Sequence, residues 1–123
     1  MSLFDLKWRK DSCEVSWKDD HSTEIVRRYR EPVQSVTILN DGSGIVIVGS
    51  YHEQGPQNAM IVNKDGTDRC RLTLPFHYEL VYGYYDTYYE GLELKAIIST
   101  TSGDSMVTVD PLTGALSDLH ETR

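Results

Sequence analysis

The sequence contains only two cysteines in 123 residues and no long apolar run. Cys13 and Cys70 have no second metal-ligating residue at a useful spacing, so we expect two reduced, packed thiols and no disulfide framework. No stretch approaches the roughly 20 apolar residues that cross a bilayer, and the N-terminus lacks the apolar segment of a secretory signal. We therefore expect a cytoplasmic protein that does not associate with membranes, or one from which a leader has been removed.

The sequence also lacks recognisable catalytic and cofactor motifs. There is no glycine-rich phosphate loop, and Gly42-Ser43-Gly44 lacks the Gly-x-Ser-x-Gly spacing of a nucleophile elbow. Residues 63–68 fail as a calcium loop, because the frame set by their glycine places Ile61 and Leu72 where carboxylates are required. The four histidines lie far apart and are expected on the solvated surface: His21, His52, His77 and His120. We expect no catalytic residues, no metal site, no cofactor and no enzymatic activity.

Negative charge predominates and is unevenly distributed along the chain. The net charge is −7, with 19 Asp and Glu against 12 Lys and Arg. Residues 1–31 sum to zero, so residues 32–123 carry the whole excess. An acidic body repels phosphate backbones, which argues against nucleic acid as the main partner, and it attracts basic proteins. The simpler interpretation, that acidity keeps the protein soluble, stays open.

Alternation of apolar and polar residues dominates the chain and predicts strands. Val15 and Trp17 alternate with polar residues and belong to a predicted N-terminal hairpin. Residues 45–48 are apolar on both faces, which is typical of a central strand. Residues 92–100 form a predicted strand with four apolar residues on one face: Leu92, Leu94, Ala96 and Ile98. Residues 52–57 are expected to form a polar loop.

Residues 22–31 are ambiguous between helix and strand. Ile25 and Tyr29 would stack at i,i+4 on a helix ended by Pro32, whereas a strand would place Ile25, Arg27 and Tyr29 on one face. The β-branched pair Ile25-Val26 and the neighbouring strands favour a strand. The basic cluster at residues 27–30 is expected to form local salt bridges, although it could also contact an anion.

A strand–turn–strand phrase occurs twice, as NAMIVNKDGT at residues 58–67 and DSMVTVDPLTG at residues 104–114. Met60 and Met106 are 46 residues apart, within the range of propeller blade periods. Residues 107–116 resemble the turn between the two outer strands of a quinoprotein-type or related β-propeller blade, and residues 62–66 are similar to the same turn. The resemblance covers about residues 33–120 and implies blade-like units, but no function, because propellers host many functions.

The predicted fold is an all-β, single-domain antiparallel β-meander of ten or eleven strands. An N-terminal hairpin region (1–31) precedes two blade-like four-stranded units (33–75 and 78–120). Two units are too few for a closed propeller, which needs at least about four blades. A β-barrel or sandwich is the alternative, and the free sheet edges make self-association possible.

Tyrosine is concentrated in one segment, with six of the eight tyrosines at residues 78–89. Alternation places three of them, Tyr78, Tyr82 and Tyr84, on one face of a half-buried strand. The others fall at its end or in a predicted loop at residues 86–91, beside two carboxylates. Because tyrosine is enriched in interface hot spots, the candidate partner-binding residues are Tyr85, Asp86, Tyr88, Tyr89 and Glu90.

These observations lead to the hypothesis of a small, acidic, non-catalytic protein-binding module. It would be an inhibitor or immunity-type protein that neutralises a basic toxin or enzyme. One alternative is a barrel or sandwich whose inward tyrosines line a small-ligand cavity. Another is a structural subunit that completes a propeller or sheet by self-association.

Overall fold

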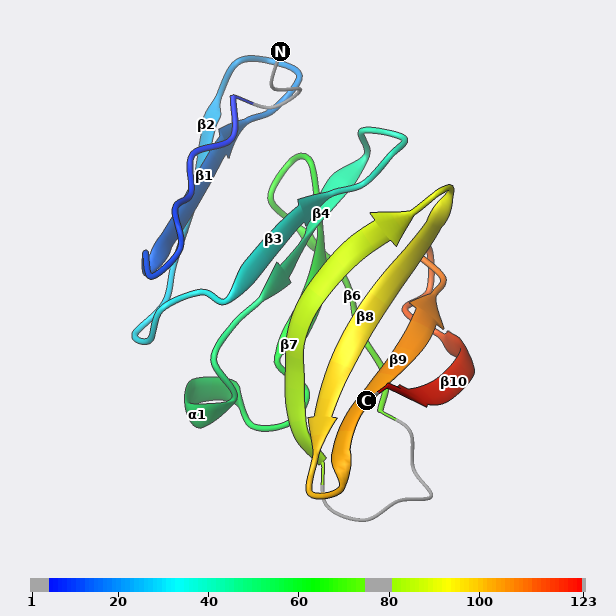
Figure 1. The fold of residues 1–123 in the computed structure, drawn as a ribbon. Helices are drawn as coiled ribbons and strands as arrows, with labels where there is room; N and C mark the ends of the chain where they lie inside the picture. The colour runs from blue at the N-terminus through cyan, green and yellow to red at the C-terminus, as the bar shows by residue number, and fades with distance from the viewer. Residues whose placement is uncertain (1–4, 75–80, 123) are drawn as a thin grey trace.

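The chain folds almost entirely into antiparallel strands, which confirms the predicted all-β class (Figure 1). The computed structural model describes residues 5–74 and 81–122. The strands form a two-stranded hairpin (β1–β2) and two four-stranded meanders, called here sheet B (β3–β6) and sheet C (β7–β10). The elements in chain order are β1 (Glu14–Lys18), β2 (Glu24–Arg28), β3 (Ser35–Ile38), β4 (Gly44–Val48), α1 (Tyr51–Gln54), β5 (Ala59–Asn63), β6 (Asp68–Arg71), β7 (Val81–Glu90), β8 (Glu93–Thr100), β9 (Gly103–Val109) and β10 (Leu116–Thr122).

Sheet B is the central layer of the molecule. Every residue of β4 is buried, as expected for a strand that is apolar on both faces. Gly44 lies against β5, where an added Cβ would come within 2.3 Å of the Val62 carbonyl oxygen, so a side chain there would push the two strands apart. The helical turn α1 occupies much of the segment predicted as a polar loop. The Ser50 hydroxyl caps this turn by accepting a hydrogen bond from the His52 amide at 3.1 Å.

Sheet C repeats the meander with longer strands. β7 runs for ten residues, so most of the segment expected as a loop at residues 86–91 is strand. The register of β7 against β8 shifts between Val81 and Gly83 and again between Tyr84 and Asp86. Each shift marks a β-bulge, in which an extra residue breaks the alternation of side chains. The strict alternation predicted for the tyrosine segment therefore does not hold.

The hairpin covers one face of sheet B. β2 confirms the strand preferred for residues 22–31. Trp17 is buried at the contact and donates from its indole nitrogen to the Lys64 carbonyl oxygen at 2.7 Å. The Arg27 guanidinium bonds to the Asp68 carboxylate at 2.8 Å, which joins β2 to β6. Burial lowers the pKa of Arg27, whereas its partners Asp68 and Tyr29 raise it. The net result is a pKa above the ordinary arginine value.

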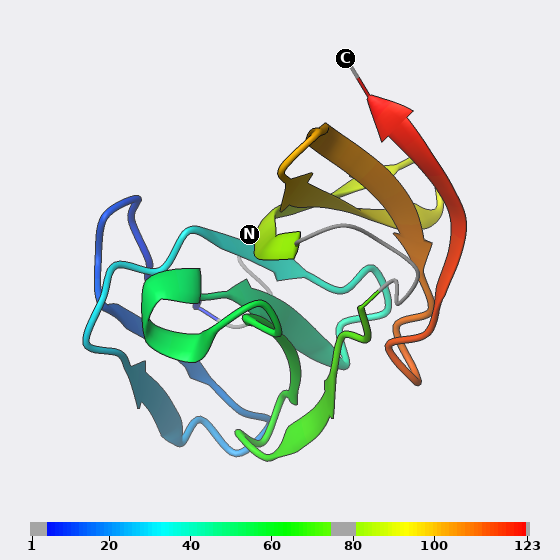
Figure 2. The ribbon, with the colours of Figure 1, turned by 90° about the horizontal axis from the view of Figure 1, so that it is seen from below.

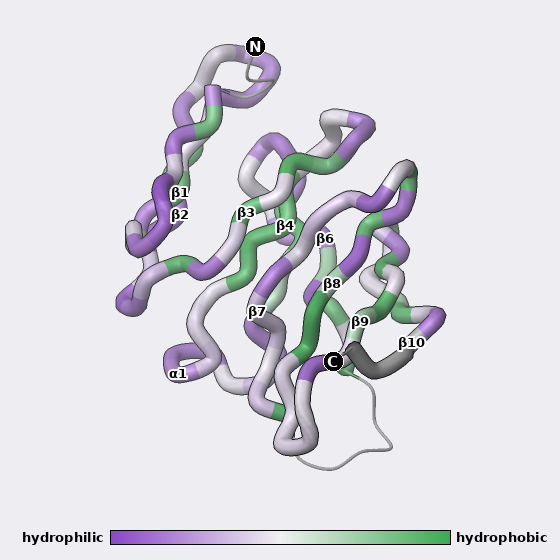
Figure 3. Tube along the Cα trace, viewed as in Figure 1, coloured by the Kyte–Doolittle hydropathy of each residue, from purple (hydrophilic) through white to green (hydrophobic). Residues whose placement is uncertain are grey.

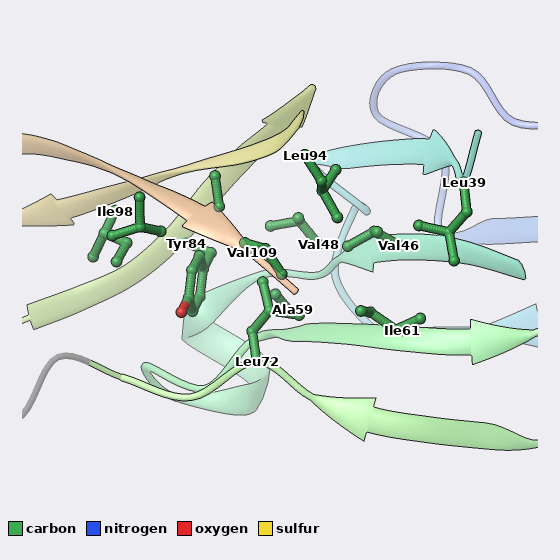
Figure 4. Close-up of a cluster of buried hydrophobic side chains, with 12 residues drawn as sticks. Leu39, Val46, Val48, Ala59, Ile61, Leu72, Tyr84, Leu94, Ile98 and Val109 are labelled. Atoms are coloured by element: carbon green, nitrogen blue, oxygen red, sulfur yellow. The ribbon is translucent and has the colours of Figure 1, made fainter. Parts of the chain in front are cut away.

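Two apolar clusters hold the three layers together. One lies between the hairpin and sheet B and is built from Val15, Trp17, Val33, Ile45, Ile47 and Val62. The larger one lies between sheets B and C, where buried side chains of both sheets meet (Figure 4). Figure 3 shows the hydrophobic segments gathered in β4, β8 and β9, and Figure 2 shows the hairpin, sheet B and sheet C following one another. The order of layers is therefore the order of the chain.

Sheet B packs against the hairpin and sheet C packs against sheet B, and the two sheets use equivalent faces for these contacts. The turns after β5 and β9 are closed by corresponding bonds, from the Asn63 amide to the Thr67 carbonyl and from the Asp110 amide to the Ala115 carbonyl. This correspondence aligns Val62, which packs with the hairpin, with Val109, which packs with sheet B. Successive blades of a propeller stack in this sense, but no sheet among the described residues closes into a barrel.

Candidate functional site

Sheet C has one face against sheet B and one face that no described strand or helix overlies (Figures 1 and 2). Along β8, Leu94, Ala96 and Ile98 are buried against sheet B, so the alternate residues point away from it. Tyr88 and Thr108 are the register partners of Lys95, and Met106 is the β9 partner of Ile97, so these three residues share that outward direction. Tyr85 stands in the bulge before Asp86, and its hydroxyl reaches Asp104 of β9 on the same side. We call this surface the outer face of sheet C and define it by six residues: Tyr85, Tyr88, Lys95, Ile97, Met106 and Thr108.

Two tyrosines from β7 reach across β8 on the outer face. The Tyr85 hydroxyl donates to the Asp104 carboxylate at 2.7 Å, and the Tyr88 hydroxyl lies 2.8 Å from the Met106 sulfur. Both acceptors are on β9, so each ring spans the strand between. Ile97 is the register partner of Met106 on that strand. The hydrogen bond to Asp104, followed by partial burial, raises the pKa of Tyr85 to about 12. These contacts fix the positions of both rings on the face.

Among the described side chains, carboxylates outnumber bases around this face. Lys95 is mostly buried, ion-paired with Glu93 at 3.1 Å and hydrogen-bonded to the Thr108 hydroxyl at 2.7 Å. The pKa of Lys95 is raised, first by the Glu93 carboxylate, with smaller contributions from Glu90 and Asp118. We call the four carboxylates near this face the acidic rim: Glu90, Glu93, Asp104 and Asp118. One largely compensated lysine therefore faces four acidic groups.

The structure separates the five predicted site residues along β7. Tyr85 and Tyr88 lie on the outer face of sheet C. Asp86 contacts β3 instead, because its carboxylate accepts a hydrogen bond from the Ser35 hydroxyl at 2.9 Å. The Tyr89 hydroxyl accepts from the Asn40 amide at 3.1 Å, on the side facing sheet B. Glu90 ends the strand and is exposed.

Tyr89 lines a cleft of its own between the tips of sheets B and C. The cleft has a volume of about 310 Å³, and Leu92, Leu94, Val109 and Pro111 supply much of its apolar wall. Asp41 and Glu93 are its charged residues. Leu92 stands at the turn after β7 with 92% of its surface exposed, although alternation had placed it with the buried residues of β8. Tyr89 and Glu90 thus belong to the tip of sheet C.

The alternation within β8 already contained a signal for the other residues of the outer face. If Leu94, Ala96 and Ile98 face the core, Lys95 and Ile97 must face away. Met106 could not be assigned in the same way, because the repeat pairs it with Met60, which packs against the hairpin. When the turns after β5 and β9 are superimposed, the spacing between equivalent residues of the two sheets is one residue longer than the spacing from Met60 to Met106. Met106 therefore corresponds to Ala59, which is buried toward sheet C.

The described residues contain no group of three or more metal-ligating side chains that could hold an ion. His21 and His52 are exposed, whereas His77, Tyr78 and the side chain of His120 lie outside the described atoms. Both cysteines are free thiols. No helix in the described part of the chain is long and apolar enough to span a membrane.

Comparison of the chain with protein-family models, with curated proteins and with solved structures found no match.

Proposed function

We propose that the protein is a small acidic, non-catalytic binding module that captures a basic protein on the outer face of sheet C. It acts as an inhibitor or immunity-type protein, because occupation of a toxin or enzyme surface is enough to block that partner. Tyr85 and Tyr88 supply the contact area, and the acidic rim supplies the charge. Localisation in the cytoplasm, with its reduced thiols, is part of the proposal.

The observation that carries the proposal is the composition of an uncovered sheet face. The corresponding face of sheet B presents Ala59 and Ile61 and is buried under sheet C. Sheet C presents Met106 and Thr108 at those positions, together with two anchored tyrosines. A mixed aromatic and polar surface is typical of interfaces between proteins that also exist separately. Tyrosine is among the residues that dominate binding energy at such interfaces.

The charge distribution supports a basic partner over a second copy of the chain. The acidic rim attracts Lys and Arg and speeds the approach of a basic protein at low ionic strength. Two outer faces brought together would instead oppose their carboxylates. The small-ligand alternative has less support, since twelve buried side chains fill the space between sheets B and C.

The test compares two tyrosines of the same strand. The immobilised protein is exposed to a lysate of its source organism, and retained proteins are identified by mass spectrometry. The affinity of each purified candidate is then measured for wild type, Tyr88→Ser and Tyr82→Ser. Tyr82 is the matched control, because it is 43% exposed but stacks on Tyr51 of α1, away from the outer face.

The expected partner is basic and loses activity when bound. Tyr88→Ser should weaken binding by about tenfold or more, as for a hot-spot aromatic, while Tyr82→Ser stays within about twofold. Affinity should also fall as salt rises, because exposed charges are screened. Equal affinities for Tyr88→Ser and wild type would show that the outer face is not the binding surface.

A further inference from the structure

A second surface lies on the side of sheet B that faces away from sheet C. It is a cleft in the angle between the hairpin and sheet B. This cleft has a volume of about 430 Å³, which is within the size range of small-molecule sites. Ile47 and Met60 contribute its apolar residues, and Tyr29 lies beside them. Three arginines from two strands line the same cleft: Arg27 and Arg28 of β2 and Arg71 of β6.

Arg71 is the arginine with spare binding capacity. It is the register partner of Met60 and therefore shares the sheet face that looks toward the hairpin. One of its nitrogens, Nη1, donates to the Gln57 carbonyl oxygen at 2.8 Å and lies 3.4 Å from the Gln54 amide oxygen. No carboxylate of the described residues forms an ion pair with Arg71. The positive charge of Arg71 thus has only neutral partners. The N–H groups of its Nε and Nη2 atoms remain available to donate hydrogen bonds to a ligand.

The other two arginines are fixed by partners outside the cleft. Arg27 is held by Asp68 and by the Gly66 carbonyl oxygen, and Arg28 pairs with Glu14 at 2.8 Å. The predicted salt bridging of this basic cluster is thus observed. Glu53 is the acidic residue of the lining, and one oxygen of its carboxylate already accepts from the amides of Arg30 and Glu31. Arg71 is therefore the one guanidinium group of this lining that no described carboxylate pairs with.

This balance of charge differs from that of other clefts in the described surface. The Tyr89 cleft is lined by two acids and no base. A cleft near the N-terminus sets Lys7 and Arg9 against Glu14 and Glu24. In a protein of net charge −7, a cleft whose lining holds three arginines and one acid, with Arg71 unpaired by any described carboxylate, is less acidic than the rest of the surface. An anion therefore meets less repulsion in this cleft than elsewhere on the surface, and Arg71 offers it a guanidinium group.

We propose that this cleft binds a small organic anion, with Arg71 as the group that holds its carboxylate or phosphate. Guanidinium forms paired hydrogen bonds with both kinds of oxyanion. Ile47, Met60 and Tyr29 contact the apolar body of the ligand. The site lies on a different face from the acidic rim, so it is independent of the proposed binding of a basic protein.

Phenyl phosphate and benzoate are suitable probes, because they share an apolar ring and differ in the anionic group. Each is titrated to about 20 mM into the isotopically labelled protein, and amide and arginine Nε–H resonances are followed by NMR. We expect saturable shifts at Tyr29, Gln54, Met60 and Arg71. Arg71→Gln should weaken binding by about tenfold, the effect of losing a charge-assisted pair of bonds. The tighter-binding probe identifies the anionic group of the ligand.

Arg9→Gln is the matched control, because Arg9 is exposed and the variant has the same net charge as Arg71→Gln. It should bind within about twofold of wild type, since it removes only long-range attraction. Equal weakening by both variants, or no saturable shift with either probe, overturns the proposal. The Arg71 Nε–H resonance of the wild-type protein gives a readout that needs no folded variant, and its failure to shift overturns the proposal as well.

Discussion

At the scale of single residues, the contact between sheets B and C depends on a buried amide. Asn58 has no exposed surface, and its nitrogen donates to the Gly49 and Tyr84 carbonyl oxygens at 2.7 and 2.6 Å. Its oxygen accepts from the Tyr84 amide at 2.7 Å. Asn58 therefore satisfies three backbone groups beside the bulge of β7, where the sheet ladder is interrupted.

We predict that Asn58→Ala lowers the free energy of unfolding by about 2–4 kcal/mol, because the backbone groups left unpaired are buried. Urea denaturation monitored by tryptophan fluorescence measures the change. Asn40→Ala is the control, since Asn40 is exposed and only its backbone amide is used, so its cost should be about 0.5 kcal/mol or less. Equal costs for the two variants would contradict the structural role of Asn58.

Tyr85 gives the protein a predicted sensitivity to alkaline pH. Its folded pKa, about 12, is above the value of about 10 for a free tyrosine. The folded state therefore retains this proton after the unfolded state loses it. The contribution of the Tyr85 hydroxyl to folding stability is fully present below pH 10 and declines as pH rises toward 12.

The measurement compares wild type with Tyr85→Phe, which lacks the phenolic proton. Their difference in unfolding free energy should be constant from pH 8 to about 9.5 and should shrink by pH 11. Tyr84, whose pKa is also raised by burial, is common to both proteins and cancels. A difference that does not change with pH would show that the bond to Asp104 does not set this pKa.

At the scale of elements, the sequence predicted most strands but not how β7 directs its side chains. The period-two pattern was sufficient for β4 and β8, whose buried residues alternate or fill both faces as expected. It was insufficient for β7, because a bulge depends on how two strands pair and leaves no period in one strand. The structure places the partly buried Tyr85 and Tyr88 on the outer face of sheet C, and their role in binding stays a prediction. The inward contact of Asp86 with β3 was not foreseen.

The hairpin offers a test of how one element depends on another. Trp17→Phe removes the indole bond to Lys64 and part of the apolar contact with sheet B, so we predict a loss of about 1–3 kcal/mol. Hydrogen exchange should accelerate more in β1 and β2 than in β8 and β9. Trp8→Phe should cost less, since no described group accepts a hydrogen bond from the Trp8 indole. Uniform acceleration across all sheets would show that the hairpin does not open separately.

At the scale of the whole molecule, the order of the layers came from contacts that are distant in sequence. The two four-stranded units and the hairpin could be predicted from turn residues and alternation. Their stacking could not, because it depends on which face of each sheet meets its neighbour. Val62 and Val109 decide this in the structure, whereas the more obvious pair, Met60 and Met106, points to the wrong alignment.

We predict that the protein is monomeric at neutral pH and low salt. The acidic rim opposes the approach of two outer faces, and the net charge of −7 adds a general repulsion. Sedimentation velocity from about 10 to 200 μM at about 50 mM salt tests this, because screening is weak there. A stable dimer under these conditions would instead favour the structural-subunit alternative.

The stacking of layers in one sense has a consequence for assembly. The molecule has two unlike ends, the hairpin and the outer face of sheet C. Any contact that joined one end to the other would be heterologous, and such contacts propagate into rings or fibres instead of stopping at a pair. The carboxylates around sheet C oppose a contact between two outer faces, but they do not oppose this end-to-end contact, because residues 1–31 sum to zero charge. Substitutions that neutralise these carboxylates are therefore expected to favour pairs of outer faces first, whereas any association that leaves them intact is expected to run end to end.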